Sequence, residues 1–323
     1  MRKCPLFPGG PEVSVIGLSL SAPPTASLPL GQLAILAPQT EDPAANGEDA
    51  TAATVAHAVA LGVNLIDTDW ITANGHAQEL FGRAIKGLNR DSLFITSKAG
   101  PRLAFKGDLT LDNSRANLIN QCHDSLFRIK TSHIDLYQVH WPDSTAPAQT
   151  ARGLQDLMSG GHARFAGVCN YSLDQVTALA ALVELRGVQA PLNLLNRRAL
   201  DTLLPWCRKH GVAFLAADPL HSGLLAGRYT GDEVFTDEDR DEWFTPPAFS
   251  RAVEFAKRLE AWAQPRAMTG PRAAVAWALA QPGVTSVLCP AHSPEVISEL
   301  ARAAEAPLSA PDLAAIEALA ESV

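Results

Sequence analysis

The feature that most restricts the fold of this chain is the regular alternation of short apolar runs with helical segments. Eight runs are rich in β-branched residues: Val15–Leu18, Val63–Ile66, Leu93–Thr96, Ile134–Val139, Arg164–Val168, Val188–Asn193, Val212–Ala216 and Thr285–Leu288. Segments with helical periodicity lie between them, for example Ala52–Leu61, Gln78–Lys86, Arg115–Phe127 and Leu173–Leu185. Strands and helices that alternate in this way are typical of parallel sheets.

Eight such strands predict an α/β fold of the (β/α)8 TIM-barrel type. A barrel of this kind commonly occupies a chain of 323 residues as one domain, so we expect a single domain over residues 1–323. An open doubly wound sheet is the alternative, but no Gly-x-Gly-x-x-Gly follows the first strand. In a TIM barrel, the active site is expected at the C-terminal ends of the strands.

Two segments interrupt the alternation. Residues 21–49 follow the first strand and are rich in Pro and Ala, with an apolar stretch at Leu28–Leu36. We expect this insertion to pack over the barrel mouth or against a second copy of the chain or a partner protein; a surface loop without function is the alternative. The long loop at 229–249 is acidic and aromatic, and it is interpreted either as an ordered loop near the mouth or as a solvated connector.

Composition excludes several classes of function. The net charge of −8 gives no electrostatic reason to bind nucleic acid or an anionic membrane surface. No apolar run approaches the roughly 20 residues of a spanning helix, and the basic N-terminus lacks the apolar core of a signal peptide. A cytoplasmic protein is therefore expected. Five scattered cysteines without CxxC spacing are interpreted as reduced thiols, with no metal site.

Three polar residues stand at corresponding ends of successive predicted strands. Asp67 ends the second strand, Lys98 follows the third, and His140 follows the fourth. Because the C-terminal ends of parallel strands meet at one mouth of a barrel, these side chains are expected to converge on one small volume. A single histidine at a strand end is most often structural, whereas three such residues together indicate a site.

These residues lie in motifs that resemble the aldo-keto reductases. The resemblance rests on residues 62–82, on Asp124–Tyr137, on Gly167-Val-Cys-Asn170-Tyr, on Asn193-Leu-Leu-Asn-Arg197-Arg and on Ala276–Ser286, and it extends from Val13 to Leu319. It implies a TIM barrel in which NAD(P)H gives a hydride to a substrate carbonyl and a tyrosine protonates the new alkoxide. The Lys–Asp pair, here Lys98 and Asp67, lowers the pKa of that tyrosine, and the histidine, here His140, orients the carbonyl.

The catalytic tyrosine of the family is replaced by Thr72 in this chain. A threonine hydroxyl is a far weaker acid than a phenol and is carried on a shorter side chain, so Thr72 does not simply replace the general acid. Of the three tyrosines, none is an evident substitute. Trp70, Trp141 and Trp243 are candidates for the wall of an apolar substrate pocket, and simple packing is the alternative for each.

The positions that the resemblance assigns to NADP(H) are partly altered. The residues at these cofactor-binding positions are Cys169, Asn170, Gln189, Pro219, Leu220, Gly223, His292 and Ser293. Cys169 stands in place of a serine, Ala217 in place of the aromatic residue that stacks on the nicotinamide, and Pro290 in place of a glycine near the phosphates. His292 replaces an arginine and is a weaker, pH-dependent phosphate ligand. Binding of NADP(H) is therefore predicted to be weakened or lost.

Three functions remain open. The first, which these substitutions favour, is acid–base, non-redox chemistry by Asp67, Lys98 and His140 on a small organic molecule in the old pocket. The second is NAD(P)H-dependent carbonyl reduction with a substitute proton donor. The third is a non-catalytic binding or regulatory subunit, in which Asp67 and Lys98 are merely a buried ion pair. A Schiff base at Lys98 and a nucleophilic Cys169 are less favoured.

Overall fold

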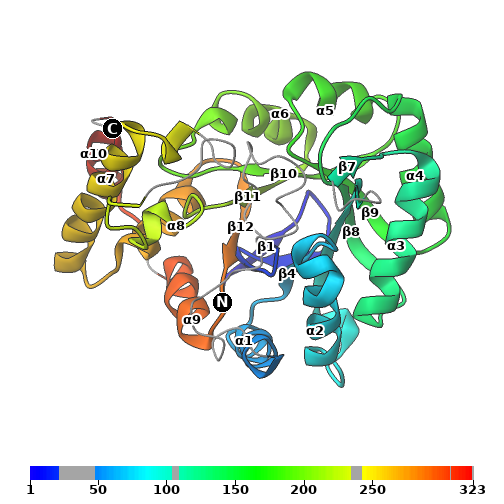
Figure 1. The fold of residues 1–323 in the computed structure, drawn as a ribbon, viewed down its shortest axis with the longest axis horizontal. Helices are drawn as coiled ribbons and strands as arrows, with labels where there is room; N and C mark the ends of the chain where they lie inside the picture. Colours follow the sequence, from blue (N-terminus) through cyan, green and yellow to red (C-terminus); the bar gives the residue numbers. More distant parts are fainter. Residues whose placement is uncertain (22–47, 104–108, 234–241, 306, 322–323) are drawn as a thin grey trace.

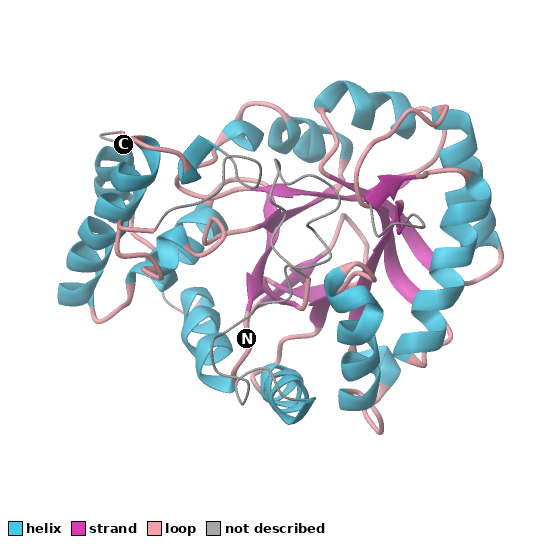
Figure 2. Ribbon diagram, in the orientation of Figure 1, coloured by secondary structure: helices cyan, strands magenta, loops and turns pink. Residues whose placement is uncertain are grey.

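The computed structural model describes residues 1–21, 48–103, 109–233, 242–305 and 307–321. A closed barrel of eight parallel strands occupies its centre (Figures 1 and 2). The strands are β3 (Ile16–Ser19), β4 (Leu65–Asp67), β5 (Phe94–Ala99), β8 (Ile134–Val139), β9 (Ala163–Cys169), β10 (Leu185–Pro191), β11 (Ala213–Ala217) and β12 (Val284–Pro290). Strand β12 pairs with β3 and closes the barrel. Each predicted run overlaps one of these strands, so the predicted TIM barrel is confirmed.

Helices surround the strands as an outer ring (Figure 1). They are α1 (Glu48–Ala60), α2 (His76–Ala84), α3 (Arg115–Ile129), α4 (Pro147–Ser159), α5 (Leu173–Ala180), α6 (Leu203–His210), α7 (Ala248–Ala263), α8 (Gly270–Ala280), α9 (Pro294–Ala301) and α10 (Ala310–Ala320). Side-chain caps fix several starts: Ser114 accepts the Asn117 N–H of α3, and Ser172 forms a capping box with Gln175 at α5.

The predicted helix over 173–185 is too long at its C-terminal end. Helix α5 ends at Ala180, and Leu185 is the first residue of β10. Val183, four residues after buried Leu179, is also buried and continues the helical spacing through a turn that contains neither Gly nor Pro. The helical spacing of buried apolar residues therefore extends beyond the point where the helix ends. Strand β10 also ends at Pro191, two residues before the predicted end at Asn193.

The N-terminal end of the barrel is covered by a two-stranded hairpin, β1 (Lys3–Pro5) with β2 (Glu12–Ser14). Its apolar residues Leu6, Phe7 and Val13 pack against inward-facing strand residues in a separate core cluster. A second short antiparallel pair, β6 (Pro101–Leu103) with β7 (Leu109–Leu111), follows β5. The hairpin closes one end of the barrel and leaves the opposite, C-terminal end for a site.

Most of the insertion at 21–49 and the centre of the 229–249 loop lie outside the described residues. The described part of the second loop is ordered: the Tyr229 hydroxyl donates to the Ser222 carbonyl at 3.1 Å, and Phe244 is buried against Phe249. This part packs on the chain that follows β11, at the C-terminal end of the barrel. Among the described helices, none has the length and apolar character needed to cross a membrane.

Candidate active site

Asp67, Lys98 and His140 converge at the C-terminal ends of β4, β5 and β8, as predicted. Lys98 Nζ donates to Asp67 Oδ1 at 2.6 Å, and both side chains are 1% exposed. The lysine also donates to the Thr68 carbonyl and to the Ser21 hydroxyl, each at 3.2 Å. His140 is 5% exposed and lines the same small cavity. The three residues therefore form one buried polar cluster.

Asp67 is held by several donors in addition to Lys98. The Thr96 hydroxyl donates to Oδ1, while Ser19, Ser21 and Gln189 approach Oδ2 at 3.3–3.4 Å. Buried charge is tolerated where it is paired and its remaining lone pairs are satisfied. The arrangement therefore fixes the carboxylate in one orientation and keeps the ion pair intact.

The electrostatics of the cluster define what each group does. Burial alone lowers the pKa of Lys98, but Asp67 and Asp69 outweigh it, so the pKa of Lys98 is raised and the amine stays charged. Burial and the Lys98 charge hold the pKa of His140 well below its ordinary value, so the imidazole is neutral. Burial raises the pKa of the Cys169 thiol to about 12. A Schiff base at Lys98 and a thiolate nucleophile at Cys169 are both disfavoured.

Thr72 begins a tight turn between β4 and α2. Ala73, Asn74 and Gly75 have positive φ, so the chain reverses over a few residues and Thr72 is held at 3% exposure. The Thr72 N–H donates to Asp69 Oδ1 at 2.8 Å, and the Thr72 side chain is among the groups that lower the pKa of this carboxyl group. Asp69, 1% exposed, was not predicted as a site residue.

Two joined cavities open at this end of the barrel. The inner one, about 20 Å³, is lined by Asp67, Lys98, His140, Cys169 and Gln189 and has room for about one water. The outer one is a groove of about 630 Å³, within the usual size range of ligand sites. Residues shared by both are Ser19, Ser21, Asp218 and Pro290. Thr72 lines the outer groove and not the inner cavity.

Of the residues predicted for the nicotinamide end, Cys169 and Gln189 line the inner cavity, whereas Asn170 lines neither cavity. Asn170 has a positive φ of 61°, and its side-chain amide donates to the His140 backbone carbonyl at 3.2 Å. The side-chain Oε1 of Gln189 accepts from the Gln138 side-chain amide at 2.8 Å. Ala217 lines the cavity with a methyl group where the resemblance implies an aromatic ring. One of the two predicted amides is therefore at the cavity, and no aromatic ring stands at position 217.

Arg228 brings a positive charge to the groove, which Glu299 also lines. His292 lines the groove as well, and burial, followed by the Arg228 charge, lowers its pKa. Leu220 and Gly223 also line the groove, as predicted for a phosphate loop. Ser293 instead caps α9, accepting the Val296 N–H at 3.4 Å, and Pro219 does not line either cavity. Arg228 was missed by the sequence reasoning; its place after the Gly223 segment was the available signal.

The three tryptophans proposed for the substrate pocket lie outside the linings of both cavities. The Trp141 ring stacks on His140, with ring centroids 3.6 Å apart. Trp70 is 8% exposed and its indole N–H has no hydrogen-bond partner within the described residues. The Trp243 ring lies edge-on to the His221 ring, with ring centroids 6.3 Å apart. Their role in substrate binding stays a prediction.

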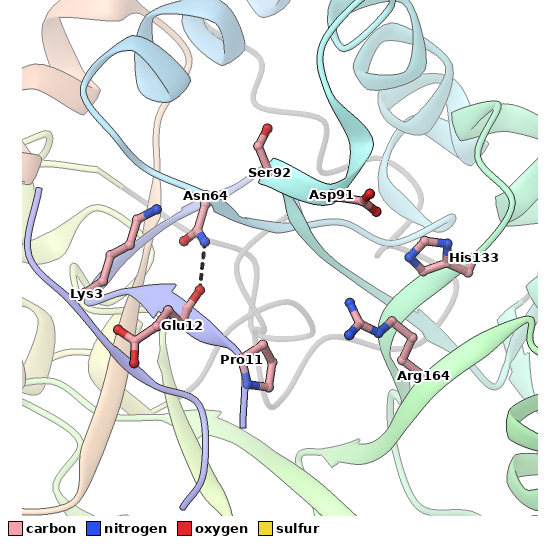
Figure 3. A pocket seen from close by; sticks show the side chains of 8 residues that line it. All are labelled: Lys3, Pro11, Glu12, Asn64, Asp91, Ser92, His133 and Arg164. Carbon is pink, nitrogen blue, oxygen red and sulfur yellow. Dashed lines mark hydrogen bonds between the residues drawn. The ribbon is translucent and has the colours of Figure 1, made fainter. Parts of the chain in front are cut away.

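A cavity of about 670 Å³ lies at the other, N-terminal end of the barrel (Figure 3). Its lining mixes both signs of charge: Lys3 and Arg164 with Glu12 and Asp91. The cluster beside it is structural, because buried Asp135 pairs with Arg90 at 2.6 Å and with Arg164 at 3.0 Å. None of the predicted site residues lines this cavity.

The chain is similar to known proteins over most of its length. It is 33% identical to an aldo-keto reductase of Bacillus subtilis over 257 residues, which cover 76% of this chain and 77% of the relative. Its fold matches a glycerol dehydrogenase from Gluconobacter oxydans at a TM-score of 0.81, with 28% identity and coverage of 97% and 93%. An aldo-keto reductase from Klebsiella pneumoniae in complex with NADPH gives a TM-score of 0.73, with 26% identity and coverage of 99% and 95%.

The sequence profile described as the Aldo/keto reductase family matches residues 37–321. This range contains Asp67, Lys98 and His140 as well as the groove-lining loops after β11 and β12. The chain therefore belongs to the aldo-keto reductase family.

Proposed function

We propose that this protein is an NAD(P)H-dependent oxidoreductase that interconverts a carbonyl compound and an alcohol without the tyrosine acid of its family. The observation that carries the proposal is the continuity of the groove. It runs from the Lys98–His140 cavity, past Ser19, Ser21, Asp218 and Pro290, into a groove that is lined by Arg228 and His292. An elongated ligand with a polar ring at one end and phosphates at the other suits this distribution of groups.

The residues present fit a nicotinamide dinucleotide along most of its length. Gln189 supplies an amide in the inner cavity, and the turn around Gly223 supplies backbone at the groove wall. Arg228 supplies a positive charge for phosphate, and His292, whose pKa is lowered, lies in the same groove. When bound, such a cofactor supplies or accepts the hydride. The loss of an aromatic wall at Ala217 and of a backbone N–H at Pro290 supports weaker binding than in relatives that keep both.

The protein's own groups then orient the substrate oxygen. Neutral His140 is available to donate a hydrogen bond to a carbonyl, and charged Lys98 adds positive potential where negative charge develops on that oxygen. Asp67 holds the lysine in position through the 2.6 Å contact. This chemistry requires a proton as well, and Asp67 is fully engaged with its donors.

Cofactor-free acid–base chemistry is the second candidate, and one observation favours it. The Gln189 amide is satisfied by the protein itself, with its oxygen accepting from Gln138 and its N–H directed at Asp67. A residue so engaged has less capacity to hold a nicotinamide carboxamide. Enolisation or dehydration of a small molecule held against His140 and Lys98 requires no such contact.

Binding and turnover separate the two candidates. NADPH and NADH are titrated against tryptophan fluorescence and by calorimetry, and oxidation of each is then followed with glyceraldehyde and 4-nitrobenzaldehyde. The reductase predicts saturable binding that Arg228→Met weakens and Asp91→Asn, at the opposite end of the barrel, leaves unchanged. Absence of binding at millimolar cofactor refutes it and favours the second candidate. Unaltered natural activity in both Lys98→Met and His140→Ala would refute both candidates and favour a non-catalytic protein.

A further inference from the structure

Asp69 is a buried carboxyl group that the family motif does not account for. It follows β4 by two residues and is 1% exposed, and it lies near Lys98, Asp67 and Cys169. Its Oδ1 accepts the Thr72 N–H at 2.8 Å, whereas its Oδ2 has no hydrogen-bond partner among the residues that the structure describes. A buried oxygen without a donor is costly as part of an anion and much less costly as a neutral O–H.

The groups around Asp69 act in opposite directions. Burial raises its pKa, and the Lys98 charge together with hydrogen bonds from Thr72 and Ser21 opposes this; the net result is a raised pKa. Asp67 and Cys169 face the same cluster from β4 and β9, and His140 faces it from the end of β8 as a neutral ring. The Asp69 carboxyl group therefore stays protonated to a higher pH than an ordinary aspartic acid does.

Thr72 connects this carboxyl group to the groove. Its N–H donates to Asp69 Oδ1 at 2.8 Å, and its side chain is among the groups that lower the pKa of Asp69. Thr72 also lines the 630 Å³ groove, which joins the His140 cavity through Ser19 and Ser21. Asp69 itself lines neither cavity. Any proton that Asp69 gives to a bound molecule must therefore pass through a neighbouring hydroxyl, and Thr72 presents one at the position where the family has its phenol.

We infer that Asp69 and Thr72 form a proton relay that replaces the tyrosine of the family, with Thr72 touching the substrate oxygen and Asp69 positioned behind it as the proton source. This inference rests on the proposed reductase function. It assigns Thr72 a catalytic role and Asp69 a positioning role in the same site.

The relay balances as follows. The carbonyl carbon gains a hydride from the reduced nicotinamide, and the carbonyl oxygen becomes an alkoxide. The Thr72 O–H bond breaks as its proton moves to the alkoxide, and a new Thr72 O–H bond forms with the proton released by Asp69. Asp69 is left as a carboxylate beside charged Lys98 and is reprotonated from water. Because the threonine never carries a net negative charge, its weak acidity does not limit the transfer.

Four variants of the full chain test the relay: Asp69→Asn, Thr72→Val, Thr72→Ser and the remote control Asp91→Asn. Each is titrated with NADPH by fluorescence, and turnover of 4-nitrobenzaldehyde is measured from pH 5 to pH 10. Carboxyl titration in the protein without cofactor is followed by NMR of ¹³C-labelled aspartate. Thermal melts confirm that each variant folds.

The relay predicts that wild-type kcat falls as pH rises through the pKa of Asp69. Asp69→Asn and Thr72→Val each lower kcat by about 10²-fold or more and abolish this pH dependence. Their affinity for NADPH stays within about threefold of the wild-type affinity. Thr72→Ser, which keeps a hydroxyl, retains most of the rate. In the NMR titration, Asp69→Asn removes one aspartate resonance that titrates above the ordinary range, and Asp91→Asn does not.

Two outcomes overturn the inference in distinguishable ways. If the wild type neither binds nor oxidises NADPH, the reductase proposal fails and the relay fails with it. If the wild type reduces the aldehyde and both Asp69→Asn and Thr72→Val keep its rate and pH profile, the relay alone is wrong. Should Asp69→Asn fail to fold, Thr72→Val decides, since it removes the relay and keeps the carboxyl group.

Discussion

Removal of the charge on Asp67 tests whether the Asp67–Lys98 pair is an electrostatic unit. The two charges lie 2.6 Å apart at 1% exposure. In Asp67→Asn, Lys98 keeps a carbonyl and a hydroxyl at 3.2 Å but loses its direct counter-ion. Breaking a buried pair by removing one partner costs about 3–5 kcal/mol. Asp69 stays nearby and partly compensates, so we expect a loss near the lower figure.

The double variant Asp67→Asn/Lys98→Met removes both charges. Replacement of a buried pair by neutral groups is often close to neutral in stability, so the double variant should recover most of the loss. The thermal midpoint should fall by roughly 6–12 °C in the single variant, at about 2–4 °C per kcal/mol, and by much less in the double. The wild type, the two single variants and the double variant together form a double-mutant cycle. Their stabilities are measured by circular dichroism melts and by urea unfolding followed by tryptophan fluorescence.

The coupling free energy of the cycle decides the result. An electrostatic unit predicts coupling of about 2 kcal/mol or more. Strictly additive effects, or an Asp67→Asn variant that melts with the wild type, would refute the reasoning, because the pair would then contribute no net electrostatic stabilisation.

Three further predictions follow from the charges. Because the native pKa of Asp69 is raised, its contribution to stability is lost as pH rises from about 4 through the native pKa; Asp69→Asn should flatten this part of the melting-temperature profile, and an unchanged slope would contradict it. Burial and Arg228 lower the pKa of His292, so wild-type NADPH affinity should fall as pH rises through that pKa. His292→Arg should tighten NADPH by about tenfold, the value of one charge-assisted bond, and should remove this pH dependence. Calorimetry measures both effects, with NADH, which lacks the 2′-phosphate, for comparison; an unchanged affinity for both cofactors would show that His292 contacts no phosphate. Asp135→Asn should destabilise the fold by about 3 kcal/mol in urea unfolding while cofactor binding persists, and altered binding would show that the two ends of the barrel are coupled.

The barrel could be predicted from sequence because its eight strands carry a local signal. Each strand is a short β-branched run, and the strand ends place Asp67, Lys98 and His140 together whatever the details of the loops. The C-terminal end of α5 could not be predicted in the same way, since buried Val183 continues the helical spacing beyond the last helical residue, Ala180. The ends of such helices depend on tertiary packing, which can override the helical spacing of apolar residues in the sequence.

Asp69 and Arg228 show what a motif comparison omits. Neither residue is among the positions that the resemblance assigned to catalysis or to the cofactor. The Asp69 carboxyl group reaches the Thr72 N–H three residues along the chain. In the turn that follows, three successive residues take positive φ, and two of them, Ala73 and Asn74, are not glycine. The place of Arg228 at the groove depends on how the chain after β11 folds back. Both features follow from loop conformation, which the local sequence does not specify.

The central claim is that the groove still binds a nicotinamide dinucleotide. The most direct measurement is a titration of the purified protein with NADPH and NADH, followed by tryptophan quenching and calorimetry, with Arg228→Met as the groove variant and Asp91→Asn as the control. Saturable binding at micromolar to submillimolar concentrations, weakened in Arg228→Met alone, is the predicted result. No binding of either cofactor at millimolar concentration would contradict the account.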